Sequence, residues 1–438
     1  MNFLILLSLK LSFSQSPVFE LLNSNQTGVE FNNLIEDKKE HNILLYANYY
    51  GGGGVGIADF DNDGLQDIYF GGNLVSDVIY RNLGDFKFED KTINSGINDN
   101  GSWSSGVTIA DVNNDGLLDV YVSKELYDDK PELRRNKLYI NKGNFTFEES
   151  SKSWGVDVSA RTRHAVFFDY NNDGHLDLYL LNQPPNPGSY SKFFGSDLTL
   201  PEYSLQLFRN TGSNSFIDVT EEAGLKRTGF PNSVVASDLN NDGFVDLYVA
   251  NDFEAPDFLY FNNGDGTFSY ETESSLKHTS FYSMGVDSAD INNDGELDIM
   301  VVDMTAEDNF RLKSNMSGMN PSAFWKVVKD GGHFQYMFNT LQINNGDKTF
   351  SDVAQYTKTS STDWSWANLI ADFDNDGLKD IYVTNGLLRD IRNTDAEKNL
   401  GEFVVEIAEN YVKNNPNQGD IDLWDILPLD EALKLVPS

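Results

Sequence analysis

The sequence contains no cysteine among its 438 residues. Disulfide bonds, zinc–thiolate sites, thiol catalysis and lipid attachment through an N-terminal cysteine are therefore excluded. Positive charge is also scarce, with 32 Lys and Arg against 68 Asp and Glu and a formal net charge of -36. Because phosphate binding needs a basic surface, this imbalance argues against nucleic acid as a partner.

Long apolar runs are nearly absent. The first 15 residues, MNFLILLSLKLSFSQ, hold a short apolar run followed by small residues at Ser12 and Ser14, which predicts a signal peptide over residues 1–15. Lys10 interrupts that run and a basic start is missing, so a buried first strand and a misassigned start are the alternatives. No later stretch is apolar enough to span a bilayer, so no transmembrane segment is predicted.

What the sequence does contain is one nine-residue pattern, present six times: DFDNDGLQD from Asp59, DVNNDGLLD from Asp111, DYNNDGHLD from Asp169, DLNNDGFVD from Asp238, DINNDGELD from Asp290 and DFDNDGLKD from Asp372. Asp occupies the first, fifth and ninth positions, Asp or Asn the third, and Gly the sixth. Calcium takes about six to eight oxygen ligands, and the Gly permits the sharp turn that wraps the chain around one point. The pattern therefore predicts six calcium loops, and magnesium is disfavoured because it retains several waters.

The predicted ligands are the side chains at positions one, three, five and nine and the carbonyl at position seven. Loop by loop they are Asp59, Asp61, Asp63, Leu65 and Asp67; Asp111, Asn113, Asp115, Leu117 and Asp119; Asp169, Asn171, Asp173, His175 and Asp177; Asp238, Asn240, Asp242, Phe244 and Asp246; Asp290, Asn292, Asp294, Glu296 and Asp298; and Asp372, Asp374, Asp376, Leu378 and Asp380. A single copy could equally be a plain hairpin turn, because Asp, Asn and Gly are common turn residues. Six copies favour about six Ca²⁺ ions, structural rather than sensory at the calcium levels outside a cell.

Each loop lies between two strands. An apolar run such as VGIADF precedes it and a β-rich run such as IYF follows, while the Glu that an EF-hand needs at the twelfth position is missing from all six copies. Five units continue with a hairpin marked by Asn and Gly, such as LYINKGNFTFEES from Leu138. Successive loops begin 52 to 82 residues apart, so we predict an all-β fold, a β-propeller of four-stranded blades whose edges are hidden by radial closure.

The propeller is predicted over residues 16–390 and a short helical segment over residues 391–438. Within the lead-in, Thr27–Asn33 alternates like a strand. After the sixth loop no outer hairpin follows, and Thr394–Lys413 instead has the pattern of an amphipathic helix with Thr394 as its cap. Either Thr27–Asn33 helps to complete the sixth blade, or the chain is a fragment of a longer protein, and we favour the fragment.

The DxDxDG loop, followed by a strand and an aromatic hairpin, resembles the FG-GAP and VCBS repeats of integrin α-subunit propellers. It is more similar still to bacterial proteins related to cartilage acidic protein, which often carry an ASPIC/UnbV region. The resemblance covers roughly residues 50–385, where six loops and no ASPIC/UnbV region are visible. It implies a seven-bladed, calcium-loaded propeller that is secreted or at the cell surface, with a periplasmic location as the alternative.

A ligand surface is predicted on the face opposite the loops, where the inner strands begin near the axis. Counting eight residues back from each loop gives mostly aromatic residues and one arginine. With their neighbours, the predicted ligand contacts are Trp103, Arg161, Arg163, Phe230, Tyr282, Trp364 and Trp366. Aromatic rings beside a few hydrogen-bonding groups suit a glycan or a peptide, and the alternative is that these rings pack between blades as core.

These patterns predict a binding or adhesion module for an extracellular glycan or protein ligand, acting as a monomeric propeller or as part of a longer chain. The alternative is a polysaccharide lyase or hydrolase, in which Arg161, Arg163 and His164 would combine a base with a cation. Only five histidines are present, and no nucleophile motif recurs. No catalytic residue is therefore predicted.

Overall fold

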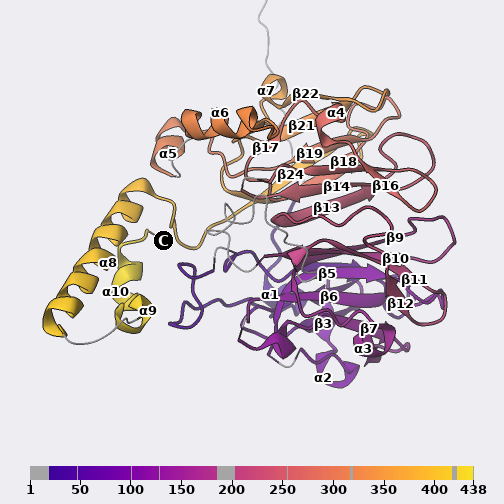
Figure 1. The fold of residues 1–438 in the computed structure, drawn as a ribbon. Helices are drawn as coiled ribbons and strands as arrows, with labels where there is room; N and C mark the ends of the chain where they lie inside the picture. The colour runs from indigo at the N-terminus through magenta and orange to yellow at the C-terminus, as the bar shows by residue number, and fades with distance from the viewer. Residues whose placement is uncertain are drawn as a thin grey trace, which may run out of the picture.

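The computed structural model describes residues 19–437 except 47, 100, 128, 185–202, 254, 316–318 and 417–421. The predicted signal peptide lies outside the described residues. Figure 1 shows successive sheets arranged as a fan, from the indigo and purple part of the chain to the orange part. Helices α8 (Thr394–Asn414), α9 (Leu423–Ile426) and α10 (Leu429–Lys434) lie to one side of this fan.

Six sheets follow one another in chain order, and each begins with two antiparallel strands joined by one of the six loops. The first five sheets have four strands and the sixth has two in the described part of the chain. The strands are, blade by blade, β1 (Val55–Ala58), β2 (Asp67–Phe70), β3 (Val78–Asn82) and β4 (Phe88–Asp90); β5 (Trp103–Ala110), β6 (Asp119–Glu125), β7 (Lys137–Asn141) and β8 (Phe147–Glu149); β9 (Arg161–Phe168), β10 (Asp177–Gln183), β11 (Gln206–Asn210) and β12 (Phe216–Asp218); β13 (Pro231–Ser237), β14 (Asp246–Asn251), β15 (Phe258–Asn262) and β16 (Phe268–Tyr270); β18 (Val286–Ala289), β19 (Asp298–Val301), β21 (Thr340–Asn344) and β22 (Phe350–Asp352); and β23 (Ser365–Ala371) and β24 (Asp380–Asn385).

The hydrophobic core is divided into layers between neighbouring blades. One layer joins Tyr179 and Leu207 of the third blade to Val234 and Leu247 of the fourth, and corresponding layers lie between the other consecutive blades. Both faces of an inner blade are therefore covered, which is why its second strand is a continuous apolar run rather than an alternating one. The predicted all-β propeller of four-stranded blades is confirmed, with five four-stranded blades and a two-stranded sixth among the residues that the structure describes.

The connections between blades contain short helices. A one-turn helix follows the last strand of four blades: α2 (Thr92–Ser95), α3 (Ser151–Trp154), α4 (Thr272–Ser275) and α7 (Ala354–Thr357). A 3₁₀ helix, η1 (Pro131–Arg134), precedes β7, and a parallel pair of short strands, β17 (Thr279–Ser280) and β20 (Gln335–Tyr336), flanks the fifth blade. The long connection between β19 and β20 carries α5 (Asn309–Ser314) and α6 (Pro321–Lys329).

The lead-in differs from the prediction. The predicted strand at Thr27–Asn33 is wrong, because α1 (Ser24–Thr27) occupies its first residue and the rest forms no strand ladder. Side chains hold it instead: Phe31 stacks on Phe70 at 4.7 Å, and the Tyr80 hydroxyl accepts from the Glu30 amide at 3.1 Å. These contacts lie on the first blade, so this segment does not complete the sixth.

The C-terminal helices return to the lead-in. Leu433 of α10 packs against Ile43 and Tyr49, and Arg389 pairs with Asp37 at 3.3 Å. Helix α8 spans the predicted range, but its N-cap is Asn393 rather than Thr394. The Asn393 side chain accepts hydrogen bonds from the backbone amides of Asp395 and Ala396 in the first turn.

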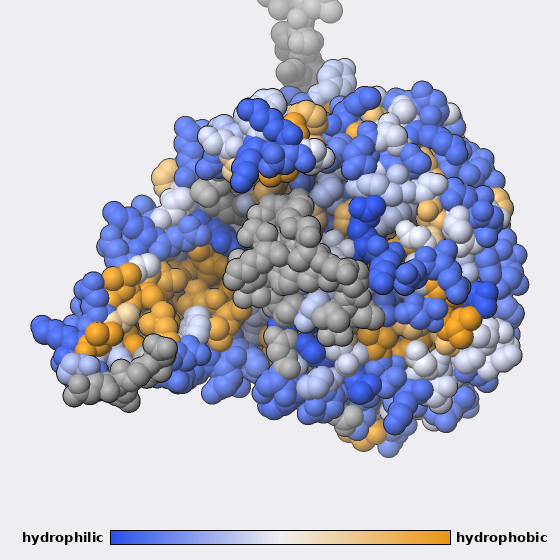
Figure 2. Space-filling model, in the orientation of Figure 1, coloured by the Kyte–Doolittle hydropathy of each residue, from blue (hydrophilic) through white to orange (hydrophobic). Residues whose placement is uncertain are grey.

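Figure 2 shows hydrophobic surface gathered on these helices, where Val405 and Val412 are exposed. In the part of the chain that the structure describes, no helix combines the length and the apolarity that crossing a membrane requires.

Candidate metal centres and ligand cavity

The six loops share one backbone shape that their own side chains impose. In the first loop, Asp59 accepts from the Asp63 amide at 3.0 Å and from the Gly64 amide at 2.7 Å. The fourth residue, Asn62, and Gly64 both adopt positive φ, at 55° and 88°. Asn tolerates this region and Gly favours it, so the repeated Asn–Asp–Gly sequence presets the turn. The same two amides bond the first aspartate in the other five loops.

The ninth residue connects each loop to the body of its blade. In the fourth blade Asp246 is fully buried, and its two oxygens accept from the amides of Leu239 at 2.9 Å and Asn262 at 2.8 Å. Burial raises the pKa of this carboxyl to about 7, against the lowering effect of both amide bonds. Burial likewise raises the pKa of Asp119 and Asp177 to about 7, and that of Asp67 to about 6. A nearby cation would favour the charged form of each.

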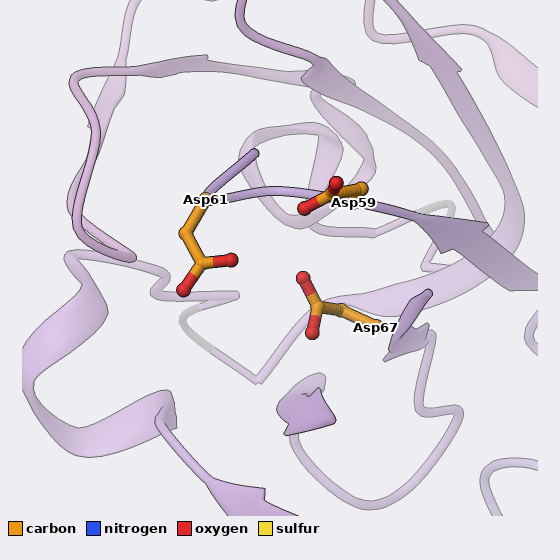
Figure 3. Close-up of side chains that lie close together, drawn as sticks. All are labelled: Asp59, Asp61 and Asp67. Atoms are coloured by element: carbon orange, nitrogen blue, oxygen red, sulfur yellow. The ribbon is translucent and has the colours of Figure 1, made fainter. Parts of the chain in front are cut away.

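Carboxylates converge most closely in the first and last loops, which share the sequence DFDNDGL. One oxygen from each of Asp59, Asp61 and Asp67 lies within 4.8 Å of the other two, and Figure 3 shows these carboxylates pointing toward one another. Oxygens of Asp372, Asp374 and Asp376 form the second such group. These all-oxygen donor sets fit a hard divalent cation such as Ca²⁺. The buried Asp61 Oδ1, which has no hydrogen-bond partner in the described part of the chain, fits the same ion.

The loops with Asn at the third position are arranged differently. Asn113 Nδ2 donates to Asp115 Oδ2 at 2.9 Å, and its side-chain oxygen, which accepts from the Asp115 backbone amide at 3.0 Å, is the atom that could act as a ligand. The same bond occurs between Asn171 and Asp173 and in the fifth loop. At the seventh position the amide donates to the fifth aspartate, as from Leu65 to Asp63 at 2.9 Å. The use of the seventh carbonyls as ligands stays a prediction.

Two features of the loops were not predicted from the sequence. Arg81, on β3, lies 2.7 Å from Asp61 Oδ2 and 3.0 Å from Asp63 Oδ2, so the first loop has its own protein cation. Each of the first five loops also donates a hydrogen bond to the next loop, from the side-chain amide of the Asn at its fourth position. Asn62 Nδ2 donates to the Gly116 carbonyl at 3.1 Å, and the later pairs are Asn114–Gly174, Asn172–Gly243, Asn241–Gly295 and Asn293–Gly377. The Asn at this position of every loop was the available signal.

A second set of bonds crosses between blades from the hairpins. Asn262, at the end of β15, donates through Nδ2 to the Tyr170 carbonyl of the preceding blade at 2.8 Å and to the Val245 carbonyl of its own blade at 3.2 Å. Asn141, Asn210 and Asn344 make the equivalent pair of bonds. The hairpin asparagines therefore hold neighbouring loops together, in addition to forming turns.

Three of the predicted ligand contacts meet at one cavity. Tyr282, Trp364 and Trp366 line it together with Asp252 and Phe253, which follow β14. It holds about 150 Å³ of space open to water. Residues of the lead-in and of the segment before and within α8 also line it, as do two methionines beside the fifth blade: Ile43, Asn48, Tyr50, Leu387, Ile391, Arg392, Glu397, Met284 and Met304.

The other predicted contacts do not line this cavity. Trp103 and Phe230 are 0% and 2% exposed, because Tyr49 of the lead-in stacks on Trp103 and Phe253 packs on Phe230. Both rings are packing residues, as in the core alternative.

The two predicted arginines are also buried. Arg161 lies over the Tyr46 ring at 5.5 Å, and Arg163 pairs with Glu125 at 2.9 Å. Burial lowers the pKa of the neighbouring His164 to about 4, so its imidazole is neutral at physiological pH.

The repeated unit of this chain is similar to a repeat found in known proteins. The sequence matches the FG-GAP-like repeat family over residues 43–122, 129–180, 198–249, 238–301 and 327–383. It is 22% identical to cartilage acidic protein 1 of Homo sapiens over 379 residues, which cover 76% of this chain and 56% of that protein. The Xenopus tropicalis protein of the same name is 24% identical over 380 residues, covering 76% and 57%. The chain thus spans little more than half the length of these relatives.

Among solved structures, the chain is similar to an Agrocybe aegerita lectin described as recognising non-reducing terminal N-acetylglucosamine. The TM-score is 0.41 at 17% identity, covering 75% of this chain and 73% of that one. It is also similar to a fructofuranosidase from Schwanniomyces occidentalis, with a TM-score of 0.34 at 11% identity, covering 76% and 60%.

Proposed function

The chain belongs to the FG-GAP-like repeat family, and from that premise we propose that it is a calcium-loaded extracellular β-propeller that binds a glycan or protein ligand. The observation that carries the calcium assignment is the convergence of Asp59, Asp61 and Asp67 on one point. Without a cation, such carboxylates repel one another, and burial of the ninth aspartate adds a desolvation cost. A cation bound by the loop oxygens would offset both costs.

The role of the ion in this proposal is structural. When bound, calcium supplies positive charge that offsets the loop carboxylates. The chain itself supplies the connection: Asp246 is bonded to Leu239 in the loop and to Asn262 at the end of the third strand. Ordering of the loop therefore also orders the hairpin. An extracellular location suits loops of this type, since extracellular calcium modules bind the ion with Kd values of about 10⁻⁴ to 10⁻³ M.

The calcium assignment is tested by metal analysis and titration. We expect the purified protein to contain several equivalents of calcium, to lose them to EDTA, and to take them up again in a calorimetric titration. Asp374→Asn combined with Asp376→Asn should remove about one equivalent, because both residues belong to the sixth loop. Asp265→Asn, in an exposed hairpin turn, is the matched control and should leave the stoichiometry unchanged. Protein without metal that takes up none would refute the assignment.

The binding part of the proposal rests on the cavity. Aromatic walls with a few polar groups are typical of small-ligand sites, and here Trp366 and Tyr282 stand beside Asp252 and Arg392. We propose that an extracellular glycan or a protein segment is held there, which would serve recognition or adhesion. A glycan array probed with the calcium-loaded protein tests this. Binding that Trp366→Ala removes while the melting temperature changes little would support the cavity as the site, and array binding that Trp366→Ala leaves unchanged would exclude it.

A further inference from the structure

The cavity contains a buried carboxylate whose neighbouring cations are already paired. Asp252 is 6% exposed, and its Oδ1 accepts from the Phe253 amide at 2.8 Å. Two arginines influence its charge, but Arg163 is paired with Glu125 at 2.9 Å and Arg392 with Glu397 at 3.7 Å. An acid that is buried among rings without its own counter-ion is costly, so it favours a ligand that brings positive charge.

A second residue that lines the cavity, Trp364, has a hydrogen-bond donor without an acceptor among the described residues. Trp364 is 5% exposed, and its indole Nε1, which can only donate, has no hydrogen-bond partner within the part of the chain that the structure describes. The neighbouring Trp366 differs, because its Nε1 donates to the Gly386 carbonyl. Leaving a buried donor unsatisfied costs free energy, so a ligand that offers an acceptor to Trp364 is favoured. A ligand that carries both a cationic donor and an acceptor would satisfy Asp252 and Trp364 together.

The walls of the cavity add a third requirement. Phe253 and Tyr282 meet edge to face at 6.2 Å and line the cavity together with the two tryptophans. Aromatic faces attract cations and pack against the apolar face of a sugar ring. A lysine side chain would satisfy Asp252 and the rings, but it has no acceptor for Trp364. A hexosamine with a free amine meets all three requirements, because its ammonium, hydroxyl oxygens and ring face are held on one rigid ring.

We propose that the cavity recognises an amino sugar whose amine is not acetylated, with its ammonium on Asp252 and a hydroxyl oxygen on Trp364 Nε1. This inference rests on the proposed glycan-binding function and narrows its ligand class. Acetylation of the amine would remove the charge and leave the buried carboxylate unpaired.

The charge state of Asp252 sets the expected pH dependence. The pKa of this carboxyl is raised to about 7, chiefly by burial and also by Asp303, against the lowering effects of the Phe253 amide, Arg392 and Arg163. Glu397, Tyr50 and Tyr282 are the other titratable groups that line the cavity. Because the proposed ligand needs the ionised carboxylate, binding should strengthen as the pH rises from about 5.5 to about 7 and the proton leaves Asp252.

The test uses the full chain in its calcium-saturated form, titrated with glucosamine, N-acetylglucosamine and Nα-acetyl-lysine methylamide while intrinsic tryptophan fluorescence is followed. Glucosamine should bind about tenfold more tightly than N-acetylglucosamine, as expected for a hydrogen bond to a charged group. Asp252→Asn should remove this preference, and Trp364→Phe, which keeps the ring, should weaken both sugars by severalfold. Asp287→Asn, which changes a partly buried carboxylate outside the cavity, is the matched control and should leave affinity unchanged.

Three results would overturn the inference. Equal affinity for the two sugars would exclude the charge requirement, and lysine amide that binds as tightly as glucosamine would assign the cavity to a peptide instead. No binding by a protein that takes up its full complement of calcium would reject the amino-sugar site while leaving the calcium assignment intact. Failure to take up calcium is measured separately and concerns only the proposed metal loops.

Discussion

The inner blades and the sixth blade have almost the same loop but differ in how deeply their second strand is buried. In the second blade every residue of β6 is buried, whereas in β24 of the sixth blade no residue is. The tyrosine of the second strand is 0% exposed at Tyr121 and 46% exposed at Tyr382. The loop sequence therefore determines the local turn, while burial comes from the hairpin and from the next blade.

The first and sixth loops begin with the same seven residues, but their blades differ in the strands that surround the loop. Both are DFDNDGL and have the same bonds from the fifth and sixth amides to the first aspartate. The first loop also receives the Asn82 amide at Asp67 Oδ1 and the Arg81 guanidinium at Asp61, both from β3. The described part of the sixth blade has no third strand, so Asp380 is exposed and bonded through Oδ2 to Phe373 alone. The two loops thus differ in the groups that contact their carboxylates.

Removal of calcium should have the largest effect and should act on every blade. An ion that binds only the folded protein stabilises it by about 2.7 kcal/mol per site at a hundredfold excess over Kd. EDTA should therefore lower the melting temperature by many degrees. Hydrogen exchange would sharpen the comparison: loop amides should lose protection throughout, and least in the first blade, where Arg81 already offsets part of the charge. A melting temperature that is indifferent to the chelator would contradict the calcium assignment.

The next largest difference is expected between the ninth aspartates. Asp246→Ala leaves the buried amides of Leu239 and Asn262 without an acceptor, at about 1–3 kcal/mol for each. Asp380→Ala affects only the Phe373 amide at an exposed position and should cost clearly less. Urea unfolding of both variants in EDTA isolates this effect from metal binding. Equal losses of stability would show that the coverage of the inner blades contributes little.

The repeat accounts for how much of the fold the sequence could predict. A loop such as Asp238–Asp246 contains its own turn geometry and recurs, and its flanking apolar runs indicate strands. The blades and loops were therefore predictable, as was the lack of an outer hairpin in the described part of the sixth blade. The fate of Thr27–Asn33 was not, because alternation shows only that one side is covered. Phe31 is covered by Phe70 through ring stacking rather than by strand pairing.

Only some residues of the candidate site could be predicted from the sequence. Tyr282 and Trp364 could be found by counting eight residues back from their loops, and Trp366 as a neighbour of Trp364. Trp103 occupies the same position but is covered by Tyr49, which belongs to the lead-in before the first strand, β1. Asp252 lies in a connection between strands, where no periodic pattern could identify it.

A smaller difference in stability is expected between the hairpin asparagines of two blades. Asn262 donates to a carbonyl of its own blade and to one of the preceding blade, whereas Asn82 of the first blade donates only to the Gln66 carbonyl of its own. Asn262→Ala should therefore destabilise the protein by about 1–2 kcal/mol more than Asn82→Ala, since it also leaves the buried Tyr170 carbonyl unpaired. Chemical unfolding of the two calcium-loaded variants measures this difference. If Asn82→Ala proved the costlier change, the bond between blades would not be the source.

The smallest effect separates Asn62 from Asn375, the fourth residues of the two matching loops. Asn62 Nδ2 reaches the Gly116 carbonyl of the next loop at 3.1 Å, while Asn375 has no following loop in the described part of the chain. Both have φ near the left-handed region, at 55° and 59°, so replacement by Gly relaxes the backbone equally in both and the difference reports the side-chain bond. Because the bond is exposed, Asn62→Gly should be less stable than Asn375→Gly by at most about 1 kcal/mol. Differential scanning calorimetry of the calcium-loaded pair can resolve this, and a larger loss at Asn375 would mean that the sixth loop is held by a contact other than those seen at the first.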